Sequence, residues 1–249
     1  MMFRINIVVV SALLISLALS DTCGKDRVVL GDWFVAHGSP DLLEEPIPTL
    51  VGYVSTNPYD DTTNPPPSTD VYCAMQWSNT TDPDTGLRRY RLQNFNSEDE
   101  AGAANFSITH KGHCASCSTL QDLGVYIRQN LTDSTRTCGK EGVISSKWQH
   151  ECLQKIGFSE QCITIWEYNI LNTRDQCFWT CMWSDIRNEP FNKPDGSLND
   201  CLQCDEDKSG PNFKYFSGRT RRNSGIPSSI KRPGSQQYNM EHCYWYGDL

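Results

Sequence analysis

Twelve cysteines constrain most strongly how this chain of 249 residues can fold. All twelve follow residues 1–20, in which Arg4 precedes the apolar run 7–19 and Ala18-Leu19-Ser20 fits a signal peptidase site. We interpret residues 1–20 as a signal peptide that is removed, because the apolar run is too short for a membrane anchor. An even number of cysteines in a secretory chain predicts up to six disulfides. The predicted disulfide-forming residues are Cys23, Cys73, Cys114, Cys117, Cys138, Cys152, Cys162, Cys177, Cys181, Cys201, Cys204 and Cys243.

Three Asn-x-Ser/Thr sequons support the same route through the secretory pathway. They begin at Asn79, Asn105 and Asn130, which are the predicted N-glycosylation sites, and we expect one or two of them to be occupied. The formal net charge of -8 gives no reason to expect a nucleic-acid partner. The sequence therefore predicts a secreted, extracellular glycoprotein with no membrane span in its mature part and no nucleic-acid partner.

Cysteine spacing and hydrophobic patterning divide the mature chain into two parts. Residues 21–109 are acidic, and Pro, Gly and Asp separate their short apolar runs, which favours strands and loops. Two of these runs, residues 71–77 and 88–94, are predicted to form a hairpin around the turn at residues 82–86. Residues 110–249 contain ten cysteines, show helical periodicity and include a basic C-terminal loop. The predicted fold class is α+β, a β-rich N-terminal segment followed by a disulfide-rich helical subdomain.

Capping signals predict where three helices of the second part begin. Ser118 with Gln121 fits a capping box in front of an amphipathic helix. Ser146 is the predicted cap of a helix that stops at Gly157, and Ser159 starts the next helix.

A further capping box, Thr173 with Gln176, predicts one more helix start. Cys177 and Cys181 follow one helical turn apart. Residues at i and i+4 share a helix face, so we expect these two cysteines to bond to neighbouring segments and not to each other.

Cys114 and Cys117 form a CxxC pair just before the first of these helices, where the helix N-terminus lowers a thiol pKa. Gly112-His113-Cys114-Ala115-Ser116-Cys117 resembles the stretch around the catalytic cysteine of papain-family proteases. The resemblance implies that Cys117 is a nucleophile and that Cys114 is disulfide-bonded elsewhere. Outside the family pattern, His113 is a candidate base for Cys117, with His110 and His242 as alternatives. The chain departs from the family pattern because no Asn follows His242, the late histidine. A redox pair and an inert disulfide stay open as alternatives.

Two patterns are compatible with metal ligands. The pairs Cys114/Cys117 and Cys201/Cys204 have the spacing of zinc knuckles, but an oxidising compartment favours disulfides. Residues 205–210 match the first half of a calcium loop, but Phe216 stands where the twelfth position requires a bidentate Glu. We therefore predict no metal site and no cofactor.

The most distinctive polar stretch is Gly218-Arg219-Thr220-Arg221-Arg222-Asn223-Ser224-Gly225. Guanidinium groups bind phosphate, sulfate and carboxylate through paired hydrogen bonds. Arg219, Arg221, Arg222 and Ser224 are therefore predicted to contact an anionic ligand. The same arginines fit the R-x-R-R pattern of a furin-type cleavage site, and an exposed basic loop without a specific ligand is the third possibility.

Gly31-Asp32-Trp33-Phe34 resembles the G-x-W-Y/F start of the lipocalin barrel, which implies an apolar ligand pocket in the β-rich segment. The predicted function is extracellular binding of an anionic or small-molecule ligand. The alternative is an extracellular enzyme, a thiol-dependent hydrolase or a redox protein, with its active site at Cys114 and Cys117.

Overall fold

The computed structural model describes residues 42–45, 54, 56–60, 70–84, 86–128 and 130–242. The predicted signal peptide, Cys23, Cys243 and the stretch Gly31-Asp32-Trp33-Phe34 lie outside these residues. Strands precede most of the helices, which confirms the predicted α+β class. The elements are β1 (Tyr72–Thr81), β2 (Arg88–Phe95), α2 (Glu98–Ala103), β3 (Ser107–Lys111), α3 (Leu120–Arg128), α4 (Leu131–Ile144), α5 (Ser146–Ile156), α6 (Glu160–Ile186), α7 (Asp200–Lys208), α8 (Gly210–Ser217) and the short 3-10 helices η2 (Arg222–Ser224) and η3 (Gly234–Gln236).

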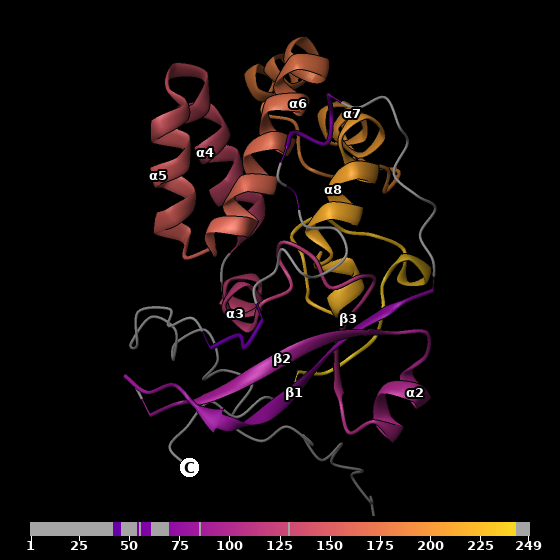
Figure 1. The fold of residues 1–249 in the computed structure, drawn as a ribbon. Coiled ribbons are helices and arrows are strands. Elements are labelled where there is room, and N and C mark those ends of the chain that lie inside the picture. Colours follow the sequence, from indigo (N-terminus) through magenta and orange to yellow (C-terminus); the bar gives the residue numbers. More distant parts are fainter. Residues whose placement is uncertain are drawn as a thin grey trace, which may run out of the picture.

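The three strands form an antiparallel sheet in the order β2-β1-β3. β1 and β2 make the predicted hairpin, in which Met75 lies opposite Leu92. Alternate residues of a strand point to opposite faces of its sheet. Cys73 and Met75 of β1 join the main core, whereas Ala74 packs in a smaller cluster with Ala101 of α2. The sheet is therefore covered by α2 on one face and by the larger helical layer on the other (Figure 1).

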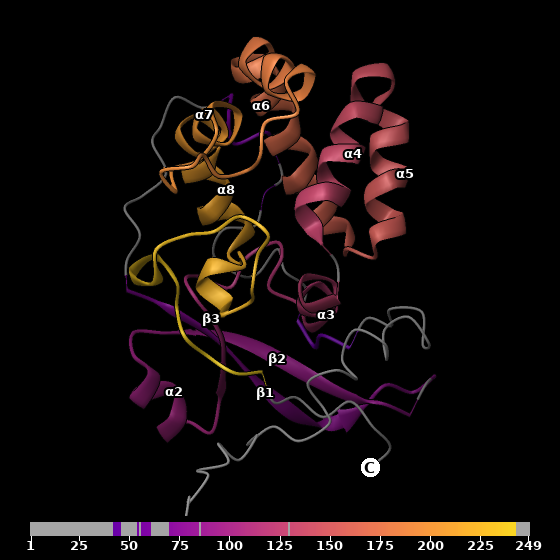
Figure 2. The same ribbon diagram turned by 180° about the vertical axis from the view of Figure 1, so that it is seen from behind.

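In the helical layer, α3 lies next to the sheet, α4 and α5 form a hairpin, and α6 stands beside α7 and α8 (Figures 1 and 2). Leu120 and Leu123 of α3 are fully buried in the main core. Trp166 of α6 stacks on Phe158 and contacts Phe213 of α8, with ring centroids 5.9 and 4.6 Å away. Although α6 has 27 residues, no helix in the described ranges is both long and apolar enough to cross a membrane.

Local signals gave the right end of α5 and the right start of α6. α5 ends at Ile156, and Gly157 adopts a left-handed φ of 105°, as predicted for a helix stop. The N-cap of α5 is Ser145, one residue before the predicted Ser146. Ser159 is the N-cap of α6, and its hydroxyl accepts a hydrogen bond from the Cys162 amide.

The other two capping predictions are wrong. α3 is capped by Thr119, because the Thr119 hydroxyl accepts a hydrogen bond from the Asp122 amide and donates one to its carboxylate. Ser118, the predicted cap, instead accepts a hydrogen bond from the Ala115 amide. Thr173 lies inside the continuous α6, where its hydroxyl donates to the Asp205 carboxylate, so packing against α7 overrides the local signal.

The ten cysteines of the described residues form five disulfides, and none of these ten is a free thiol. Cys177 and Cys181 each bond to α7, as their spacing on one helix face led us to expect. The remaining bonds join β1 to the segment before α3, that segment to α6, and α4 to α5. The pairs are Cys73–Cys114, Cys117–Cys162, Cys138–Cys152, Cys177–Cys204 and Cys181–Cys201.

This pairing predicts the outcome of alkylating the native protein without prior reduction. Because the ten cysteines of the five disulfides offer no thiol, only Cys23 and Cys243 are left as sites that could react. Intact-mass measurement of the deglycosylated protein should therefore show at most two added alkyl groups, and all twelve cysteines should react after reduction. Alkylation of Cys117 in the unreduced protein would contradict the structure.

Candidate functional site

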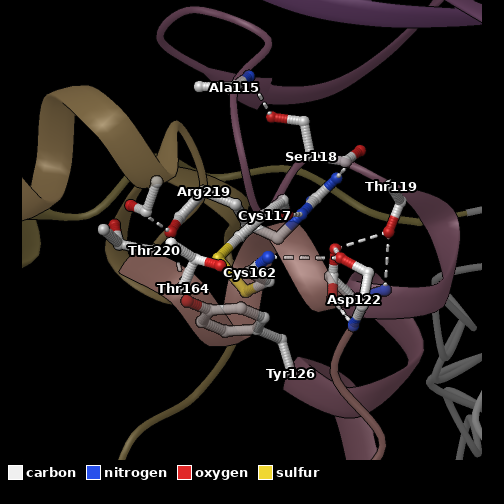
Figure 3. Close-up of a disulfide and its surroundings, with 12 residues drawn as sticks. Ala115, Cys117, Ser118, Thr119, Asp122, Tyr126, Cys162, Thr164, Arg219 and Thr220 are labelled. Carbon is white, nitrogen blue, oxygen red and sulfur yellow. Dashed lines mark hydrogen bonds between the residues drawn. A yellow bond between two sulfur atoms is a disulfide. The ribbon is translucent and has the colours of Figure 1, made fainter. Parts of the chain in front are cut away.

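Cys117, the predicted nucleophile, forms a disulfide with Cys162 at the centre of the close-up in Figure 3. Both residues are fully buried. A bonded, buried sulfur offers no thiolate, so the structure corrects the cysteine-centred enzyme hypothesis. The candidate base His113 packs edge-on against Tyr215, with ring centroids 5.4 Å apart, and burial lowers the pKa of His113.

The residues of the zinc and calcium patterns have other roles in the structure. Cys114 bonds to Cys73, whereas Cys201 and Cys204 bond to α6, so the two CxxC pairs do not meet in one site. The start of the calcium pattern, residues 205–208, is helical and belongs to α7. Within the part of the chain that the structure describes, no three His, Cys, Asp or Glu side chains are grouped to hold a metal ion.

Arg219 is fully buried, which differs from its predicted role as a ligand contact. Its guanidinium donates hydrogen bonds to the carbonyl oxygens of Cys117, Thr109 and Ser118 at 3.1, 2.9 and 3.2 Å. Ser224 is buried beside it and accepts a hydrogen bond from the same guanidinium at 3.4 Å. Arg219 and Ser224 therefore have internal roles, and a furin-type protease would find Arg219 inaccessible in the folded protein.

Asp122 completes this buried polar cluster, and the sequence analysis missed it (Figure 3). Its carboxylate accepts hydrogen bonds from the Ser159 amide and hydroxyl, both at 2.8 Å, and thereby joins the start of α3 to the start of α6. Burial raises the pKa of Asp122 to about 6, although these hydrogen bonds and the charge of Arg219 oppose the shift. The Thr119-x-x-Asp122 spacing is itself a capping pattern that would have revealed this residue.

Replacing Arg219 tests its internal role. Arg219→Met should lower the free energy of unfolding by about 3–5 kcal/mol, because three buried carbonyl groups lose a charged donor. The control Arg187→Met removes an arginine whose side chain is 66% exposed, and it should change stability by less than about 0.5 kcal/mol. Urea denaturation would measure both. Unchanged stability of Arg219→Met would contradict the internal role.

A cleft of about 630 Å³ lies between α4, α6, α7, α8 and the loop after α8. Its apolar lining comes from aromatic and aliphatic side chains of all four helices and of that loop. They include Leu131, Trp166, Phe178, Leu202, Phe213 and Ile230. A concave, largely apolar hollow of this size is typical of a small-molecule site.

Basic side chains outnumber acidic ones around this cleft. Seven basic residues but only three acidic ones line it, in a chain whose formal net charge is -8. Two of the four predicted ligand contacts, Arg221 and Arg222, are among the basic residues. The basic residues are Arg136, Lys140, Arg174, Lys214, Arg221, Arg222 and Arg232, and the acidic residues are Asp185, Asp205 and Glu206.

Glu206 of α7 holds three of these cations. Its carboxylate binds Arg222 at 2.8 Å, Arg232 at 2.9 Å, and the ammonium group of Lys214. Burial raises the pKa of this carboxyl group, but the hydrogen bonds from Lys214 and Arg222 outweigh burial and hold it at about 2. Burial also raises the pKa of the neighbouring Asp205. Three cations outnumber the two carboxyl groups of Glu206 and Asp205, so this part of the cleft keeps a net positive charge.

A second ion cluster joins the two long walls of the cleft. Asp185 of α6 binds Arg136 and, at 2.9 Å, Lys140, both from α4. Arg221 donates a hydrogen bond to the Pro227 carbonyl oxygen, and burial lowers the pKa of Arg221. The predicted anion-binding stretch at residues 218–225 supplies Arg221 and Arg222 to the cleft lining, but nothing in the local sequence connected it to the basic residues of α4.

Residues 146–240 match a protein family that is described as a family of unknown function (DUF8771). This match covers less than half of the chain and includes α5 to α8 and the loop after α8, but not α4. No curated protein matches the chain, and no solved structure does either.

Glu206 should make stability depend on pH. Its pKa is lower in the folded protein than in the unfolded chain, so its stabilising effect is complete above about pH 4.5 and is lost as the pH falls towards 2. Glu206→Gln should therefore lower the free energy of unfolding by about 2–4 kcal/mol at pH 7. The difference from the wild type should shrink between pH 4.5 and pH 2 in urea titrations.

The control for this experiment is Glu160→Gln, which removes an exposed carboxylate outside the cleft. Glu160→Gln should have little effect on the free energy of unfolding at pH 7 or at pH 3. A Glu206→Gln penalty that stayed the same at pH 7 and at pH 3 would show that the carboxylate charge is not what matters.

Proposed function

We propose that this protein is an extracellular binding protein whose cleft takes up an amphipathic anion, a small molecule with an apolar body and an acidic headgroup. The observation that carries the proposal is the lining of the cleft, in which seven basic and three acidic residues surround apolar walls in an acidic chain. Such an arrangement concentrates positive potential in one hollow and attracts anions to it.

The two kinds of lining suggest how such a ligand lies. Arg222, Lys214 and Arg232 share the single carboxylate of Glu206, so an acidic headgroup beside them would find donors that keep a net positive charge. Trp166, Phe213 and other apolar side chains offer a surface for the rest of the molecule. Removing apolar surface from water contributes about 25 cal/mol per Å², which would supply affinity beyond the ion pair.

The proposed route of the protein is secretion, with residues 1–20 removed as a signal peptide. Five disulfides are compatible with an oxidising compartment. Asn79, Asn105 and Asn130 are all exposed, so each sequon is accessible for the proposed N-glycosylation. We divide the mature chain into the acidic β-rich segment 21–109 and the mainly helical segment 110–249. Described residues of both segments share one main core.

The proposal predicts which probes bind. Decanoate combines an apolar chain with a carboxylate, decanol lacks the charge, and acetate lacks the chain. Isothermal titration calorimetry of the full secreted protein should show decanoate binding at least about tenfold more tightly than decanol or acetate, and more weakly at high salt. Equal binding of decanol and decanoate, or no binding of decanoate, would overturn the proposal.

Matched variants change the charge of the cleft in opposite directions. Arg222→Gln should weaken decanoate binding by about fivefold or more, whereas Asp185→Asn should strengthen it, because each changes the local charge by one unit. Lys155→Gln, on α5 and outside the cleft lining, should leave the affinity unchanged. Circular dichroism would check that all three variants are folded.

A further inference from the structure

Exposed apolar side chains gather at one end of the helical layer. Seven large apolar side chains of the described residues are exposed, and all seven lie at the end of α4, at the start of α5 or in the second half of α6. These parts lie at the end of the helical layer that is farthest from the sheet, at the top of Figure 1. Contiguous exposed apolar surface on a water-soluble fold marks an interaction site more often than scattered single residues do.

Four of these side chains form one side of α6, which we call the α6 apolar face: Phe178, Trp179, Trp183 and Ile186. Trp179 and Trp183 are one turn apart and are 67% and 50% exposed, so two tryptophans stand next to each other on the helix surface. Phe178 and Ile186 also line the cleft. The α6 apolar face is therefore continuous with the apolar wall of the proposed ligand site.

The charges around the α6 apolar face have no predominant sign. Arg174 pairs with Asp175 at 3.6 Å, and Arg187 pairs with Glu189 at 3.5 Å. Asp185 is already held by the cations of α4. A surface whose charges are paired in this way fits an electrically neutral, zwitterionic partner better than a strongly charged one.

We infer that the α6 apolar face docks on a zwitterionic phospholipid surface and opens the cleft to amphipathic anions dissolved in that surface. Tryptophan favours the boundary between lipid headgroups and acyl chains, because its ring is apolar and its N–H remains hydrogen-bonded. The inference rests on the proposed function, since an amphipathic ligand partitions into membranes and has to be collected from them. Phe178 and Ile186 belong both to the α6 apolar face and to the cleft lining. This continuity favours lipid over a protein partner, because a lipid-dissolved ligand could pass along it into the cleft.

The test uses the full secreted protein and phosphatidylcholine vesicles, some of which carry brominated acyl chains that quench tryptophan fluorescence. The wild type should sediment with the vesicles and be quenched. Trp179→Gln/Trp183→Gln should lower the partition coefficient at least about tenfold and lose most of the quenching. The control Lys155→Gln, near the end of α5 and outside the exposed apolar surface, should stay within about twofold of the wild type.

Decanoate binding in solution, measured on the same proteins, separates the two proposals. A double variant that binds decanoate normally but has lost the vesicles would support the docking face. A wild type that binds decanoate but not vesicles would overturn it, as would a double variant that binds vesicles normally, and the proposed function would stand in both cases. Vesicle binding through Trp179 and Trp183 without decanoate binding would support the docking face and overturn the proposed function.

Discussion

The buried guanidinium of Arg219 is the interaction on which the arrangement of the helical layer depends. A charged group removed from water is stable only when its donors are used, and this one binds carbonyl groups at the end of β3 and in front of α3. The same residue is the second of the loop that follows α8. Its burial therefore fixes where that loop leaves the core, and Arg221 and Arg222, two and three residues later, reach the cleft. Asp122 and the Cys117–Cys162 disulfide then hold the start of α6 against α3.

Different covalent bonds hold the α4 and α6 walls of the cleft. Two disulfides hold α6 to α7, and another holds α4 to α5, but none of the five joins α4 to α6. Polar contacts link α6 to α4. Asp185 of α6 binds the cations of α4, and Arg174 of α6 donates a hydrogen bond to the Gly142 carbonyl oxygen at 3.2 Å. Side-chain ion pairs and a hydrogen bond therefore link the α4 and α6 walls of the cleft, where no disulfide does.

Local sequence signals predicted the elements well and the site poorly, for physical reasons. Alternating residues and the turn at residues 82–86 were enough for the hairpin, and Gly157 was enough for the end of α5. Thr173 misled because a buried hydroxyl can serve α7 as well as it can cap a helix. The three arginines at positions 219, 221 and 222 are indistinguishable by residue type, yet one is buried and two line the cleft. That division depends on long-range packing, as does the pairing of the cysteines, which spacing alone left open.

The acidic side chains around the cleft neutralise only part of the positive charge of its basic side chains. Glu206 shares one negative charge among Lys214, Arg222 and Arg232, and its strongly lowered pKa shows how firmly the surrounding cations hold the ionised form. The cations nevertheless repel one another. Partial burial strengthens this repulsion, because less water lies between the charges to screen it. An arriving anion would reduce this repulsion, and apolar walls beside it would exclude water and strengthen each contact. The electrostatic cost of gathering cations in an acidic protein would therefore be smaller with an anion bound, and this difference is the physical basis of the proposed anionic ligand.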